Sequence, residues 1–127
     1  MTPRFRAWDK EFKEMVQVDA LVFEEQIIKA TYKNGNVVKE DLKNYVLMQS
    51  TGLTDKNGKE IFEGDIIDYN GRNAVVKWHG SYASFVYMFV DELRSRNQEW
   101  DPLYLSYFHF QVVGNKFETP ALLEVGS

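Results

Sequence analysis

Short runs of β-branched and aromatic residues, punctuated by Asn-Gly pairs, dominate the chain. The pairs occur at Asn34-Gly35, Asn57-Gly58 and Asn70-Gly71. An Asn-Gly pair suits a type I′ turn, because both central positions need a positive φ that asparagine tolerates and glycine adopts freely. The pattern therefore predicts antiparallel β-structure.

Two of these turns join runs that we expect to form β-hairpins. The first joins residues 27–33 to residues 36–39 through a two-residue loop, and the second joins residues 65–69 to residues 73–79. A third run, residues 83–90, follows closely and completes a predicted three-stranded meander.

The run 83–90 (ASFVYMFV) has no charge and is apolar on both alternating faces. A strand with one solvated face alternates apolar and polar residues, whereas a continuous apolar run indicates a strand covered on both sides. We therefore expect the N-terminal region or a second subunit to cover the other face. Residues 104–113 show a similar pattern and predict the last long strand.

Helix is expected to be scarce. Residues 91–100 begin with two acidic residues and carry arginines later, which favours one or two helical turns through the helix dipole. Thr119 followed by Pro120 predicts a short terminal turn, with threonine as N-cap and proline at the first helical position. The predicted fold class is thus mainly β.

Composition adds limits to this picture. A chain of 127 residues has the size of one compact domain, or one domain with a small annexe. Its 9 Phe, 7 Tyr and 3 Trp supply a core and exceed what one small barrel needs, so we expect the excess to mark a domain or subunit interface. The absence of cysteine excludes disulfides, thiolate metal sites and cysteine nucleophiles.

The charge is unevenly distributed. The first 45 residues carry eight basic and eight acidic side chains, so the remaining seven bases and eleven acids carry the whole net charge of −4. An acidic C-terminal part disfavours a protein that binds by neutralising many phosphates. The chain begins MTPRFRAWDKEF, without an apolar signal segment, and no stretch approaches the roughly 18 apolar residues of a membrane span. A cytoplasmic protein with no membrane partner is expected.

Candidate chemistry is sparse. Carboxylates gather between residues 55 and 68, but the EF-hand pattern fails there because Lys59 and Ile66 occupy ligand positions. Turn and capping roles explain them better. His79 and His109 are the only histidines and stand isolated, which gives a zinc site too few ligands. We expect no catalytic residue, no metal, no cofactor and no enzymatic activity.

Aromatic residues leave two interpretations open. Trp78, Tyr82, Tyr87 and Trp100 suit a surface that stacks single-stranded nucleic acid or a proline-rich peptide. Strand alternation instead places several of them in the core, since Trp78 shares a face with residues 74 and 76. Core or interface is the favoured interpretation.

Three sequence blocks resemble the YopX family, small proteins of phages and prophages. Residues 47–67 (LMQSTGLTDKNGKEIFEGDII) resemble its signature, residues 4–15 (RFRAWDKEFKEM) its opening and residues 112–123 (VVGNKFETPALL) its close. The resemblance implies a C-terminal SH3-like barrel, residues 46–127, after a smaller β-rich region, residues 1–45, in the cytoplasm of a bacterial host. It implies no reaction or cofactor. The motif residues, interpreted as structural, are Arg4, Arg6, Trp8, Gly52, Asp55, Asn57, Gly58, Glu63, Gly64, Asp65, Gly114, Asn115 and Glu118.

These observations favour a non-enzymatic module for protein interaction or self-assembly. Its expected partner is a second copy of the chain or a phage or host protein. The candidate interface comprises Phe85, Tyr87, Phe89, Tyr107 and His109, from the two-faced apolar strands. A nucleic-acid-binding small barrel is the alternative, which the negative charge disfavours.

Overall fold

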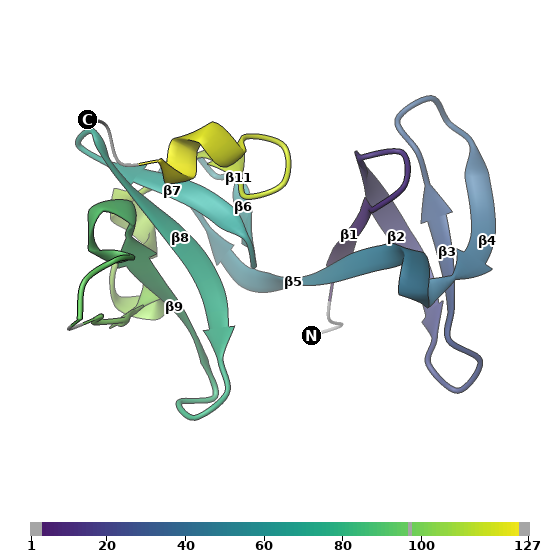
Figure 1. Ribbon diagram of the computed structural model, residues 1–127, viewed down its shortest axis with the longest axis horizontal. Helices are drawn as coiled ribbons and strands as arrows, with labels where there is room; N and C mark the ends of the chain where they lie inside the picture. The colour runs from purple at the N-terminus through teal and green to yellow at the C-terminus, as the bar shows by residue number, and fades with distance from the viewer. Residues whose placement is uncertain (1–3, 97, 125–127) are drawn as a thin grey trace. The chain divides into compact units, whose positions relative to one another are not determined.

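The computed structural model describes residues 4–96 and 98–124 (Figure 1). The chain folds into two compact units, Met1–Ser50 and Thr51–Ser127. Strand β5, Tyr45–Thr54, ends the first unit and begins the second. The unit boundary therefore lies inside a strand, five residues beyond the boundary drawn from the sequence after residue 45.

The first unit is built from antiparallel hairpins. Its elements are β1 (Phe5–Asp9), β2 (Glu14–Val22), β3 (Ile27–Thr31), β4 (Val37–Asp41), the 3₁₀ turn η1 (Leu42–Asn44) and β5. Its strands follow the order β4-β3-β2-β1-β5, and β5 continues into the second unit, where it pairs with β6 (Glu60–Phe62). Its core lies on one face of the strands, where Ala7, Val16, Ile28 and Ala30 are buried together with Tyr45.

A buried polar network lies beside this core. The Asp9 carboxylate accepts hydrogen bonds from the Tyr32 hydroxyl and from the backbone N–H groups of Glu11 and Phe12. The Tyr32 and Tyr45 hydroxyl oxygens are 2.7 Å apart. Burial alone would raise the pKa of Asp9, but these three donors lower it below its ordinary value. Burial and the neighbouring Asp9 carboxylate raise the pKa of Tyr32, so its hydroxyl remains a donor.

The second unit carries a five-stranded antiparallel sheet in the order β10-β9-β8-β7-β11. The strands are β7 (Asp65–Tyr69), β8 (Arg72–His79), β9 (Ser84–Phe89), β10 (Asp101–Pro102) and β11 (Gln111–Asn115). The 3₁₀ turns are η2 (Val90–Glu92), η3 (Leu103–Leu105), η4 (Tyr107–His109) and η5 (Pro120–Leu123). The fold is mainly β, as predicted. Over the described residues neither sheet closes on itself, so the SH3-like barrel is not confirmed.

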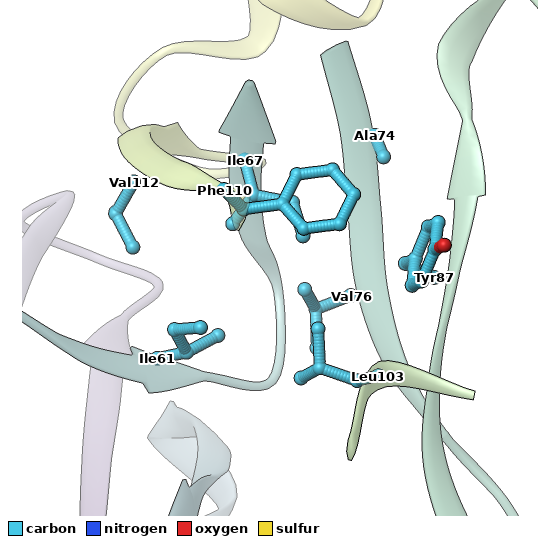
Figure 2. Close-up of a cluster of buried hydrophobic side chains, with 8 residues drawn as sticks. All are labelled: Ile61, Ile67, Ala74, Val76, Tyr87, Leu103, Phe110 and Val112. Carbon is cyan, nitrogen blue, oxygen red and sulfur yellow. The ribbon is translucent and has the colours of Figure 1, made fainter. Parts of the chain in front are cut away.

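Aromatic and aliphatic side chains from several elements form the core of the second unit. Figure 2 shows the Phe110 ring extending from the start of β11 towards β8 and β9. Its centroid lies 4.9 Å from that of Tyr87, in an edge-to-face arrangement. The complete buried cluster is Ile61, Ile67, Ala74, Val76, Tyr87, Leu103, Phe110 and Val112.

The predicted meander and the first hairpin are confirmed, but their turns differ. Asn70 and Gly71 both have positive φ, at 52° and 87°, as a type I′ turn requires. At the first hairpin only Gly35 has positive φ, and the Tyr32 N–H donates to the Asn36 carbonyl, which closes a loop of three residues. The expectation of a two-residue loop there is wrong, because a glycine after a type I turn closes the hairpin equally well.

The interpretation of β9 as a strand covered on both sides is supported by burial. Val86, Tyr87 and Met88 are consecutive and all buried. Successive side chains of a strand point to opposite faces, so three buried neighbours require cover on both. The 3₁₀ turn η5 packs against the neighbouring strand β8.

Two local predictions need correction. The long strand expected over residues 104–113 begins only at Gln111, after two 3₁₀ turns. The one or two helical turns expected from residue 91 are confirmed as one 3₁₀ turn, η2, which begins one residue earlier at Val90; residue 97 lies outside the described residues. Trp78 is 45% exposed rather than part of the core, because it lies near the end of β8, beyond buried Val76. The terminal turn with proline at its start is confirmed as η5, although the Thr119 side chain does not cap it.

Candidate functional site

The segment from Leu103 to Phe110 projects aromatic side chains out of the second unit. Leu103 and Phe110 are buried and anchor its two ends in the core. Between them the chain forms two 3₁₀ turns. The Ser106 N–H donates to the Leu103 carbonyl and the His109 N–H donates to the Ser106 carbonyl, both at 3.0 Å. A strand would alternate sides, whereas a 3₁₀ turn brings every third residue to the same side. Of the intervening residues, Tyr104, Leu105, Phe108 and His109 are exposed, whereas Ser106 and Tyr107 are half-buried.

Large apolar side chains in this segment are unusually exposed. Tyr104 and Leu105 are each 59% exposed and Phe108 is 51% exposed. Tyr69, at the end of β7, is 42% exposed. Single exposed apolar residues are ordinary, but contiguous exposed apolar groups mark sites of interaction.

Ring contacts connect part of this set into one continuous surface. The Tyr107 and Phe108 ring centroids are 5.3 Å apart, those of Phe108 and His109 are 4.2 Å apart, and those of His109 and Tyr69 are 5.9 Å apart. We call Tyr107, Phe108, His109 and Tyr69 the aromatic row. The ring centroids of Tyr69 and buried Phe110 are also 5.8 Å apart, so the row is continuous with the core. Packing against the core holds these rings without a ligand.

An arginine covers one neighbouring ring of the core. The Arg72 guanidinium carbon lies 3.8 Å above the centroid of Phe89. The same guanidinium donates to both carboxylate oxygens of Asp91 at 2.8 Å and to Glu92 at 2.9 Å. Arg72 lowers the pKa of Asp91 below its ordinary value. These charges are engaged with one another, whereas the aromatic row carries no acidic or lysine side chain.

The structure divides the candidate interface residues between two environments. Tyr107 and His109 belong to the aromatic row. Tyr87 is buried, and Phe85, Phe89 and also Tyr107 pack against the core cluster and are half-buried, so His109 is the exposed residue of the five. The sequence did not single out Tyr69, whose position before the Asn70-Gly71 turn was the available signal.

The tryptophan-containing stacking surface is not formed as proposed from the sequence. Tyr87 is buried and so offers no stacking face. Trp78 packs edge-on against Phe85, with centroids 5.0 Å apart, and the Trp100 ring lies under the Lys77 ammonium group. His79 stacks on Tyr82 at 4.2 Å. Each of these rings already contacts another side chain of the same unit.

Asp55 ties the turn between β5 and β6 to the distant strand β11. Its Oδ1 accepts the backbone N–H groups of Asn57 and Lys59, and its Oδ2 accepts that of Val112 at 2.8 Å. Burial alone would raise the pKa of Asp55, but these three donors lower it below its ordinary value. Gly58 completes the turn with a φ of 83°. A carboxylate engaged in this way has a structural role.

The closing motif forms a second compact hydrogen-bonded unit. Asn115 Oδ1 accepts the N–H groups of Phe117 and Glu118, and its amide nitrogen donates to the Glu118 carboxylate. The Thr119 hydroxyl bonds both the N–H and the carbonyl of Asn115. A Cβ atom at Gly114 would lie 2.0 Å from the Thr119 hydroxyl oxygen, so only glycine fits without a shift.

The central and opening motif residues lie in strands or directly beside them. Asp65, almost fully buried, accepts the N–H of Phe62 at 2.8 Å, and Gly64 precedes it with a φ of 88°. Glu63 and Gly64 form the link between β6 and β7, and Gly52 lies in β5. Arg6 and Trp8 belong to β1, and the Arg4 carbonyl accepts the N–H of Ser50.

The described residues form neither a metal cluster nor a membrane-spanning helix. Among the described residues, no three histidine or acidic side chains lie close enough to share a metal ion. In the same part of the chain, no helix has the length and apolar character needed to cross a membrane.

The fold and its hydrogen-bonded turns define a two-unit, all-β protein whose signature carboxylates hold the backbone. The chain belongs to the YopX family: the family model described as YopX protein matches residues 4–124. The structure is similar to the crystal structure of protein EF1440 from Enterococcus faecalis, with a TM-score of 0.56 and 29% sequence identity. That similarity covers 98% of this chain and 99% of the other. No curated protein matches the chain. The family predicted from three sequence blocks is confirmed.

Proposed function

We propose that this protein is a non-enzymatic interaction module that self-associates through the aromatic row of its second unit. The observation that carries the proposal is the continuous contact of Tyr69, His109, Phe108 and Tyr107, with Tyr69 42% and Phe108 51% exposed. Aromatic residues supply much of the contact energy of protein interfaces. The rings are already positioned, so little side-chain entropy is lost on contact.

A second copy of the chain suits this surface best. The second unit carries seven basic and eleven acidic side chains, yet the row itself has no acidic or lysine side chain. Two identical apolar surfaces are self-complementary without charge matching, and twofold dimers are the commonest oligomers. The acidic surroundings would repel nucleic acid, whose phosphates need basic partners.

A non-enzymatic role agrees with the state of the buried carboxylates. Asp9 and Asp55 accept three hydrogen bonds each from groups of their own chain. A general acid or base must reach the proton that it transfers, within about 3 Å. These carboxylates are engaged in holding turns and do not serve that purpose.

Sedimentation equilibrium of the full chain tests the proposal. Between about 1 µM and 1 mM the average mass should rise from one copy towards two, in a reversible way that follows mass action. A mass of one copy throughout this range would overturn self-association through the row. A mass that rises equally for a variant lacking the row would also overturn it.

A further inference from the structure

An open groove lies on the face of the first unit's sheet that is opposite its core. The groove has a volume of about 380 Å³ and is lined by Ala20, Val22, Ile27 and Val37, with Lys29 and Lys39 between them. Val37 is 58% exposed and both lysines are exposed. The groove lies over strands β2, β3 and β4.

The two lysines are direct cross-strand neighbours. Lys29 of β3 pairs with Lys39 of β4 in the antiparallel register. Neither ammonium group forms an ion pair or a hydrogen bond with any described residue. Like charges directly opposite each other destabilise a sheet, so a carboxylate within reach of both flexible lysine side chains would relieve this repulsion. The charge of the groove therefore selects an anionic group.

Strand β4 also offers unpaired backbone groups beside the groove. It lies at one end of the six-stranded sheet, and no described strand pairs with its outer side. The Tyr32 N–H donates to Asn36 and the Leu42 N–H donates to Gln26, each at 2.8 Å. Hydrogen-bonded and non-hydrogen-bonded pairs alternate along an antiparallel hairpin.

This alternation fixes which backbone groups point outwards. Asn36 and Leu42 belong to hydrogen-bonded pairs, so Val37, Lys39 and Asp41 belong to the non-bonded pairs between them. Their N–H and carbonyl groups therefore point away from β3, towards the free edge. Val37 and Lys39 are also the β4 residues whose side chains stand at the groove face. One added strand would thus reach both the free backbone groups and the groove.

We propose that the edge of β4 binds an extended acidic segment of a partner protein by strand addition. The segment pairs its backbone with Val37, Lys39 and Asp41. A glutamate or aspartate of the segment lies opposite Lys39 and near Lys29, with an aliphatic residue opposite Val37. Backbone bonds supply affinity in such complexes, and alternate side chains supply specificity.

A second copy of β4 is a poorer occupant of the same edge. Antiparallel pairing of two β4 strands over their full length would set one Lys39 opposite the other. Exposed lysines on edge strands are a known device against such pairing. The edge of β4 therefore disfavours pairing with a second β4 strand and favours a strand that carries a carboxylate.

Nuclear magnetic resonance titration of the ¹⁵N-labelled full chain tests the inference. The probe is the palindromic peptide acetyl-Thr-Val-Thr-Glu-Thr-Val-Thr-amide, and the matched peptide has lysine in place of glutamate. We expect the acidic peptide to shift the amide signals of Val37, Lys39 and Asp41, and to bind at least about fivefold more tightly than the lysine peptide. Equal binding of the two peptides, or shifts elsewhere in the chain, would overturn the inference.

Variants separate the charge from the backbone contribution. Lys39→Glu should reverse the peptide preference, whereas Lys56→Glu, which changes the net charge equally in the other unit, should not. Val37→Pro removes an N–H that points outwards and leaves the β3–β4 ladder complete, so it should abolish binding while Val37→Ala retains it. Binding that survives Val37→Pro would contradict strand addition. Concentration-dependent shifts confined to the β4 amide signals, without peptide and also in Phe108→Ser, would identify a second copy as the occupant and contradict a partner segment.

Discussion

The carboxylate of Asp55 accepts a hydrogen bond from the backbone N–H of Val112, 57 residues further along the chain. The contact joins the central signature motif of the YopX family to its closing motif. Both groups are buried, so neither can exchange this bond for one with water. The bond therefore holds the two motifs together in the folded second unit.

Replacement of Asp55 should destabilise the second unit. Asparagine offers one acceptor oxygen where aspartate offers two, and its amide group would face a backbone donor. Asp55→Asn should lower the free energy of unfolding by about 2 kcal/mol, the cost of leaving a buried donor without its charged partner. Urea denaturation measures the loss, and hydrogen exchange at Val112 locates it. Asp101→Asn, at an exposed position, is the control and should change little.

The same carboxylate should make stability depend on pH. The folded-state pKa of Asp55 lies below its ordinary value, so its contribution is complete above the unfolded-state value of about 3.9. It is lost as the pH falls through the folded-state pKa. The second unit of Asp55→Asn should therefore show a shallower fall in stability below pH 4 than the natural chain. Identical pH profiles of the two proteins would contradict this role.

Gly114 should tolerate no side chain while Thr119 keeps its hydroxyl. Gly114→Ala places a Cβ against an oxygen that bonds the Asn115 backbone, and overpacking of this kind costs about 1–3 kcal/mol. Thr119→Ala removes the obstructing oxygen, so the double variant should lose less stability than the two single variants together. Strict additivity in this double-mutant cycle would show that the two residues do not compete for space.

The first unit should depend on the hydroxyl of Tyr32. Tyr32→Phe removes a donor to buried Asp9 and a neighbour of the Tyr45 hydroxyl, and we expect a loss of about 1–3 kcal/mol. Tyr45→Phe leaves the Asp9 bond in place and should cost less. Residue-specific hydrogen exchange distinguishes the units, since a two-unit chain need not unfold in one step. Equal losses for the two variants would contradict the dominant role of the Asp9 bond.

Much of the fold follows from local sequence signals. The Asn70-Gly71 pair predicted its turn and the strands on either side, because few residue pairs can adopt two successive positive φ values. The consecutive apolar residues of β9 predicted a strand covered on both faces. These signals act between near neighbours, where residue type and backbone conformation are directly coupled.

Other features depend on contacts between distant parts of the chain. The apolar pattern of residues 104–113 predicted a strand, but the chain between buried Leu103 and Phe110 forms 3₁₀ turns that expose Phe108. Asp55 was expected to bond only nearby backbone, since no local pattern reveals a partner as distant as Val112. The exposure of Tyr69 likewise depends on where the core ends. The aromatic row could therefore be identified only in the folded chain.

The central claim is self-association through the aromatic row, and one paired measurement tests it most directly. Sedimentation equilibrium compares Phe108→Ser with Phe12→Ser, which removes a phenylalanine that is 68% exposed in the first unit. We predict that Phe108→Ser weakens dimerisation about tenfold or more, as loss of a central aromatic contact does, while Phe12→Ser matches the natural chain. Equal dimerisation of both variants, or a mass of one copy for the natural chain at 1 mM, would contradict the account.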